Sequence, residues 1–170
     1  MLKLLLPIDD ASKLAQALCY LAMCERESRW PITVHVLHVE PPLSHYIAEK
    51  LPRDSVKSYH THRSREVLVP VAEAFAQANI AHKTHALVGD PAQCIARFAE
   101  EFGVDRIVMV THARESIPEV LLGSVAAGVL QHSSVPVEVV PVEPGSRLSA
   151  YARVAGAGAA ILTLAYLALE

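Results

Sequence analysis

Cysteine is scarce in this sequence, with three among its 170 residues: Cys19, Cys24 and Cys94. An odd number, with two of the three close together on one predicted helix, is not the pattern of a disulfide framework. We therefore expect reduced thiols that pack as small hydrophobic side chains. Because persistent disulfides belong to oxidising compartments, this pattern favours a cytoplasmic protein.

An excess of either charge is also missing. The chain has 15 basic and 18 acidic side chains and a formal net charge of −3. Proteins that bind nucleic acid carry a basic patch or a strongly basic balance, so this composition argues against a nucleic-acid partner. A secretory leader is not expected either, because the apolar run at residues 1–6 stops at Pro7, far too early for a signal sequence.

Several motifs of catalysis and binding are absent as well. The sequence has neither the lysine signature of a P-loop nor a G-x-G-x-x-G loop. Gly123 and Ser124 begin like a nucleophile elbow, but the second glycine is missing, and His132 lies too far along the helix to act as base. A serine hydrolase is thus not expected. No metal site is expected either, because no carboxylate or thiol lies at ligand spacing among the histidines of the solvated loops. These histidines are His60, His62, His82 and His85.

What the sequence does contain is an alternation of short apolar runs and longer amphipathic segments. The apolar runs predict strands, because dense apolar or β-branched residues fill them and turn residues bound them. Strands that alternate with helices predict an α/β domain with a parallel sheet and right-handed crossovers. We place the strands at residues 2–8, 33–39, 82–88, 107–110 and 137–140.

Helices are expected between these strands. The first covers residues 14–27, where apolar residues recur at helical spacing. The third begins with Asp90 as N-cap and Pro91 as its first residue, and Gly103 suits its end. The last contains apolar residues from position 121 to position 129.

The segment between the second and third strands carries a weaker signal. Residues 43–65 are polar and mixed, with Pro52 among them, so we expect a long loop with a fragment of helix. A helix then starts near Leu68, with Pro70 in its first turn, and ends at Asn79.

Ligands of open parallel sheets bind at the carboxyl ends of the strands, where the strand order reverses. The loops that follow the first and fourth strands are therefore the places to expect a site. They contain Asp9 and Asp10 in the first case and residues 111–116 in the second. Asp9, Asp10 and Ser12 also suit the N-terminus of the first helix as capping residues.

Three segments together resemble the universal stress protein family across nearly all of residues 1–142. They are residues 4–9, which end in an Ile-Asp step, residues 87–91, which hold Gly-Asp-Pro, and residues 105–140. The last segment has Gly-Ser-Val followed by a Pro-Val strand, as the family does. The resemblance implies an open five-stranded parallel sheet with helices on both faces and strand order 3-2-1-4-5, similar to the adenine nucleotide α-hydrolase fold.

The nucleotide-binding branch of that family has a loop of the form G-x2-G-x9-G-[ST]. Counted back from Gly123 and Ser124, its first two glycines fall at positions that hold Val110 and Ala113. Glycine lets backbone N–H groups come close to phosphate, whereas valine adds a stiff, branched side chain. ATP binding is therefore expected to be weak or lost.

The resemblance still implies a set of nucleotide-binding candidates. Asp9 would accept from a ribose or an adenine amine, and His112 and Arg114 would face an anion. The alternative gives Gly123 a role in close helix packing, Ser124 a plain helix hydroxyl and Asp9 a cap. The full set is Pro7, Asp9, Val39, Gly89, Met109, Thr111, His112, Arg114, Gly123, Ser124 and Val125.

The last strand is expected at an edge of the sheet, and exposed edges invite pairing. In similar proteins this strand pairs with its copy in a second subunit, which implies a homodimer through Val137–Val142. The alternative is an edge blunted by Glu138 and Pro141.

After a linker at residues 143–147, the tail at residues 148–170 is apolar, with no charge from Val154 to Leu169. We expect one helix over residues 148–169. Basic residues on its N-terminal flank, Arg147 and Arg153, fit a membrane anchor with the domain on the cytoplasmic side. The alternative is a helix that packs on the domain or across a dimer.

Three functions remain open on this basis. The first is a non-catalytic stress-response domain that acts through partners. The second is an enzyme that hydrolyses ATP slowly at Asp9, His112, Arg114 and Ser124. The third is a regulatory module tethered to the membrane by its tail.

Overall fold

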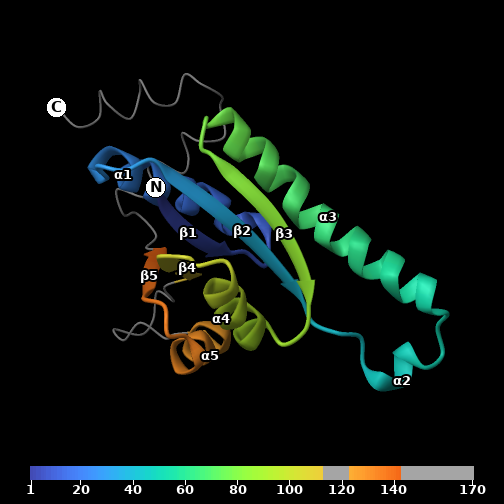
Figure 1. The fold of residues 1–170 in the computed structure, drawn as a ribbon. Coiled ribbons are helices and arrows are strands. Elements are labelled where there is room, and N and C mark those ends of the chain that lie inside the picture. Colours follow the sequence, from blue (N-terminus) through green and yellow to red (C-terminus); the bar gives the residue numbers. More distant parts are fainter. Residues whose placement is uncertain (113–122, 143–170) are drawn as a thin grey trace.

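A computed structural model describes residues 1–112 and 123–142 of the chain. It contains a five-stranded, all-parallel sheet in the order β3-β2-β1-β4-β5 (Figure 1), which confirms the expected fold and strand order. The strands are β1 (Leu2–Pro7), β2 (Ile32–Glu40), β3 (His82–Val88), β4 (Arg106–His112) and β5 (Val137–Val142). The helices are α1 (Leu14–Glu27), α2 (His45–Ala48), α3 (Arg53–Gln77), α4 (Pro91–Glu101) and α5 (Ser124–His132), with the short 3-10 turn η1 (Ala11–Lys13) before α1.

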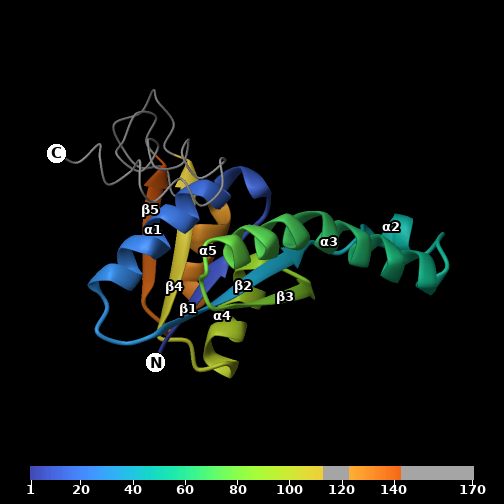
Figure 2. The same ribbon diagram turned by 90° about the horizontal axis from the view of Figure 1, so that it is seen from above.

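Strand β1 lies in the centre of the sheet and is covered on both faces (Figure 2). Leu4 and Leu6 pack with α1 and α3, whereas Leu5, between them, packs with α4 and α5. All three side chains are at most 1% exposed. Each such burial stabilises the fold by about 1.5–3 kcal/mol. The unbroken leucine run therefore follows from a strand buried on both sides.

Helix α3 corrects the expectation for residues 43–65. It is 25 residues long, Pro52 is its N-cap residue, and Pro70 lies in its interior rather than in its first turn. The buried side of its N-terminal half is occupied by His60 and Ser64, while Val67, Val71 and Phe75 follow only later. Two polar residues on the inner face remove the apolar periodicity that would have predicted the helix.

The turns confirm most of the predicted boundaries. The backbone N–H of Gln93 donates to the carboxylate of Asp90 over 2.9 Å, so Asp90 caps α4 ahead of Pro91. Asn79 and Gly103, which follow α3 and α4, both have a φ of 57°, the left-handed conformation typical of helix ends. The cap expected for α1 is wrong, because η1 intervenes and the N-cap residue, Lys13, makes no side-chain cap.

The expected solvated loop is wrong for His60 and His62, which lie in α3. His82 and His85 lie in β3, where a strand was expected. Within residues 1–112 and 123–142 no group of three or more His, Cys, Asp or Glu side chains could hold a metal ion. The three cysteines are free thiols.

The tail at residues 148–170, with its expected helix, lies outside the described residues. Among the helices that the structure describes, none has the length and apolar character to cross a bilayer.

A pair of histidines joins β2 to β3 on the α4 side of the sheet. His35 Nδ1 lies 3.1 Å from His85 Nε2, and the two rings pack against Phe98 and Phe102. One nitrogen donates and the other accepts, so the accepting ring must be neutral. Burial lowers the pKa of both histidines below the usual 6.5, and the charge of Lys83 lowers both further.

This pair should make the fold sensitive to acid. The folded state keeps the two rings neutral, so its stability is complete above the unfolded pKa near 6.5 and falls as the pH drops below that value. The double variant His35→Gln with His85→Gln keeps amide hydrogen bonding without titration. We expect its Tm to fall less between pH 7 and pH 5 than that of the parent.

Replacement of an exposed histidine, His45→Gln, is the matched control and should leave the pH slope as it is in the parent. An identical pH slope in the parent and the double variant would contradict the role of the pair.

Candidate functional site

The strand order reverses beside β1, because β2 and β3 lie on one side of it and β4 and β5 on the other. Ligand sites of open α/β sheets lie at the carboxyl ends of the strands at such a point. Pro7 is the last residue of β1, and Asp9 lies two residues further along the chain. Thr111 and His112 end β4, so the structure brings these four predicted residues to one edge of the sheet.

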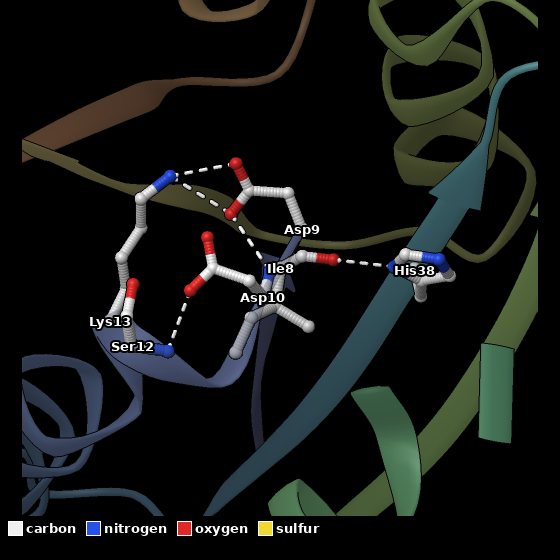
Figure 3. Close-up of polar contacts among 6 residues, drawn as sticks. All are labelled: Ile8, Asp9, Asp10, Ser12, Lys13 and His38. Atoms are coloured by element: carbon white, nitrogen blue, oxygen red, sulfur yellow. Dashed lines mark hydrogen bonds and ion pairs between the residues drawn. The ribbon is translucent and has the colours of Figure 1, made fainter. Parts of the chain in front are cut away.

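Asp9 is exposed and is held by its own loop (Figure 3). Both oxygens of its carboxylate accept from Lys13 Nζ at 2.8 Å, and the backbone N–H of Asp10 donates to Oδ1 at 3.0 Å. The carboxylate is 68% exposed. It does not cap α1, so the capping alternative for Asp9 is wrong. Its oxygens retain acceptor capacity for a ligand hydroxyl or amine.

His38 of β2 contacts the backbone of the loop that carries Asp9 (Figure 3). This buried side chain places Nδ1 2.9 Å from the carbonyl oxygen of Ile8, the residue before Asp9. The backbone N–H of Ile8 donates to the carbonyl of Leu37 at 2.9 Å. Both polar groups of Ile8 are therefore anchored on β2, and the exit direction of the loop is set by them.

The other ring nitrogen of His38 faces Glu40, with Nε2 3.2 Å from a carboxylate oxygen. Both neighbours of the ring are hydrogen-bond acceptors. His38 was not among the residues predicted for the site. The sequence does show a histidine inside the apolar run of β2. A strand covered on both faces excludes solvent, so a histidine there needs a partner within the protein.

Three other candidates serve the packing of the α4 side. Met109 and Val39 belong to the apolar cluster beneath α4 and α5. A Cβ at Gly89 would lie 2.6 Å from Sγ of the buried Cys94, so this glycine is required by the approach of α4.

Gly123 behaves differently. It is the N-cap residue of α5, and its φ is −57°, which any residue adopts. An added Cβ would have no described protein atom within 4 Å. Neither conformation nor packing in the described part of the chain demands glycine here. Ser124 and Val125 follow it at the start of α5, and no side chain of the described residues caps these N–H groups.

Val110 lies in β4 and not in a loop. It pairs with Val140 of β5, and its side chain is 9% exposed in the cluster under α1 and α3. Strand β4 continues through His112, two residues further than predicted. Ala113 and Arg114 lie outside the described residues.

Residues 1–141 match the sequence model of the Universal stress protein family. The chain belongs to the universal stress protein family. Universal stress protein MJ0577 of Methanocaldococcus jannaschii is 44% identical over 54 residues, which are 32% of this chain and 33% of that protein. That alignment thus spans about a third of the relative's length. Universal stress protein G of Shigella flexneri is 30% identical over 115 residues, 63% of this chain and 76% of that protein.

Solved structures of the family agree with the fold. The structure of MJ0577 has a TM-score of 0.65 and 26% identity, over 85% of this chain and 98% of that one. A universal stress protein from Archaeoglobus fulgidus, in complex with dAMP, has a TM-score of 0.58 and 20% identity, over 82% of this chain and 97% of that one. This universal stress protein therefore shares its architecture with a protein that holds an adenine nucleotide.

The hydrogen bond between His38 and the carbonyl of Ile8 should contribute to the free energy of unfolding. His38→Asn keeps an N–H near the position of Nδ1, whereas His38→Leu leaves the buried carbonyl of Ile8 without its donor. We expect His38→Leu to lower the free energy of unfolding by about 1–3 kcal/mol and His38→Asn to cost clearly less. Urea unfolding of both variants is the measurement.

Hydrogen exchange at the backbone N–H groups of Asp10 and Ser12, which donate to carboxylates of the same loop, provides a local readout. Exchange should speed up in His38→Leu and stay close to the parent in His38→Asn. Equal losses in the two variants would show that ring packing, and not the hydrogen bond, is what matters.

Proposed function

We propose that this universal stress protein is a non-catalytic regulatory domain that binds an adenine nucleotide weakly or not at all and acts through partners. The placement of Val110 carries the proposal. Its side chain is buried in the core, and its backbone is paired with β5. The family resemblance places the first glycine of the phosphate loop at this position. In a binding loop the backbone here would be exposed to phosphate, whereas in this protein it belongs to strand β4.

Other parts of a nucleotide site remain. Within residues 1–112 and 123–142, no side chain caps the start of α5, and no atom lies within 4 Å of a Cβ added at Gly123. Free N–H groups at a helix N-terminus favour an anion. The likeness to the dAMP-bound protein from Archaeoglobus fulgidus supports an adenine nucleotide as the ligand class. Residual binding at Asp9 and α5 is therefore compatible with a weak site.

The described residues offer little for ATP hydrolysis. The carboxylate of Asp9 is bound by Lys13 and points into solvent. Ser124 and His132 lie at opposite ends of α5, eight residues and about 12 Å apart along the axis. His132 Nδ1 instead lies 2.7 Å from the carbonyl of Gly128. No described residue thus holds a base against the Ser124 hydroxyl, which supports a non-catalytic role.

Thermal unfolding with AMP, ADP and ATP tests the nucleotide proposal on the full chain. A ligand at one hundred times its Kd stabilises by about 2.7 kcal/mol, so submillimolar nucleotide should move Tm very little here. Any small shift at higher concentration should vanish in Gly123→Val, because the added side chain fills the space beside α5. Gly123→Val should leave the Tm without ligand unchanged.

A large shift at submillimolar ATP would contradict weak binding. Ala113→Gly is the matched gain-of-function variant and should strengthen binding. Val110→Gly is less informative alone, because it removes a core side chain at a cost of about 1.5–3 kcal/mol in addition to any gain in affinity.

We also propose a homodimer through β5. This strand pairs with β4 on one side, and its other side meets no further strand within residues 1–112 and 123–142. Glu138, which would blunt a free edge, instead accepts from Arg106 of β4 at 2.8 Å. Because Arg106 neutralises the carboxylate of Glu138, that charge opposes strand pairing at the edge less than a free carboxylate would. This supports pairing of β5 with a second copy.

Sedimentation velocity tests the dimer. Val139→Pro removes a backbone donor from β5 and should shift the protein toward the 18.4 kDa monomer. Thr84→Pro in β3, the opposite edge strand, is the control and should leave association intact. Circular dichroism checks that both variants keep the sheet. Unchanged sedimentation of a folded Val139→Pro protein would contradict the β5 interface.

A further inference from the structure

An open groove of about 480 Å³ runs between α3 and β3, at the sheet edge opposite β5. Helix α3 and strand β3 run in opposite directions along it (Figures 1 and 2). The groove therefore has a polar end beside the end of β3 and an apolar end further along α3. Its helical wall consists of Lys57, His60, Thr61, Ser64, Arg65, Leu68, Val69 and Ala72.

These eight helical positions form one continuous stripe, because they recur every three or four residues. From Lys57 to Ala72 the stripe covers sixteen residues, about 22 Å along the helix axis. All of its charges lie between Lys57 and Arg65. From Leu68 onward it is apolar. A ligand that fits both ends is elongated, with a charged head and an apolar body.

The charge of the polar end is positive and unbalanced. Among the residues that the structure describes, no Asp or Glu side chain lines the groove. Lys57 and Arg65 form no ion pair with any described residue, unlike Arg63 on the neighbouring face, which binds Glu66 at 2.8 Å. Two unpaired cations at one end of a groove favour an anionic head group.

His60 adds a polar requirement that the protein leaves unmet. The side chain is nine-tenths buried, at 9% exposure, and its Nδ1 has no hydrogen-bond partner in the described part of the chain. A buried ring nitrogen without a partner destabilises the fold, so a partner supplied by a ligand would be favourable. A head group held between Lys57 and Arg65 would lie beside this ring.

Apolar side chains at both ends of the groove lack a cover. Val69 and Val88 are 50% and 49% exposed, although both line the groove. Thr84 and Ala86, on the face of β3 that meets α3, are small and leave the floor open. Large exposed aliphatic side chains on both walls of one groove are typical of a surface that a ligand covers.

We propose that this groove binds a single-chain anionic amphiphile, with its carboxylate beside Lys57, His60 and Arg65 and its aliphatic chain over Leu68, Ala72 and Ala86. Among the described residues no Phe, Tyr or Trp side chain lines the groove, and the ring of His60 is buried, so the groove offers little stacking surface for a base. The site is separate from the Asp9 region and does not rest on the proposed function.

Calorimetric titration of the full chain with dodecanoate, below its micelle concentration, tests the proposal. Dodecyltrimethylammonium has the same chain and the opposite charge. We expect dodecanoate to bind at least about tenfold more tightly, as the loss of one charge-assisted contact implies. Equal affinity for the two amphiphiles would overturn the assignment of the head group.

Variants place the binding in the groove, since the tail of the chain is itself apolar. Ala86→Leu fills the floor and should weaken dodecanoate binding about tenfold or more, whereas Ala76→Leu, an exposed alanine of α3 outside the groove, should not. Lys57→Glu with Arg65→Glu should weaken binding similarly, whereas Arg53→Glu should not. Parent affinity in folded Ala86→Leu protein would overturn the proposal.

Discussion

The burial of β1 on both faces is the constraint on which the rest of this structure depends. A central parallel strand needs helices on each side, and these helices have to cross from the end of one strand to the start of the next. The chain therefore moves outward to β3 and then returns to β4 on the other side of β1. That reversal places the ends of β1 and β4 side by side, so the candidate site exists because Leu4, Leu5 and Leu6 are buried.

The sequence predicts this scaffold well because its signals are local. The leucine run of β1 and the Asp90-Pro91 start of α4 each depend on a few neighbouring residues. The first half of α3 is missed because its inner face holds His60 and Ser64 in place of aliphatic residues. The residues of α3 that line the groove recur at helical spacing, but the first of them are basic or polar and the last are apolar, so they form no continuous apolar stripe. That they face β3 is seen only in the structure.

The candidate site divides in the same way. The residue types at Asp9 and Gly123 can be read from the sequence, but the contacts around them cannot. Lys13 binds the carboxylate of Asp9 from four residues further along the chain. A Cβ added at Gly123 would have no described atom within 4 Å. His38 escapes notice because its partner is the carbonyl of Ile8, thirty residues away. Backbone partners at such separations leave no trace in residue types.

Strand pairing explains how a nucleotide loop can be lost without loss of the fold. Val110 contributes to the core and continues the pairing of β4 with β5. A branched residue is favoured at a paired, buried strand position, while glycine there costs stability. Valine in place of glycine at position 110 would therefore weaken a phosphate loop and stabilise the sheet beside the proposed dimer edge. Under the proposed function, a stable β5 edge favours the dimer, while weak nucleotide binding has little cost. Val110 thus links the two parts of the proposed function.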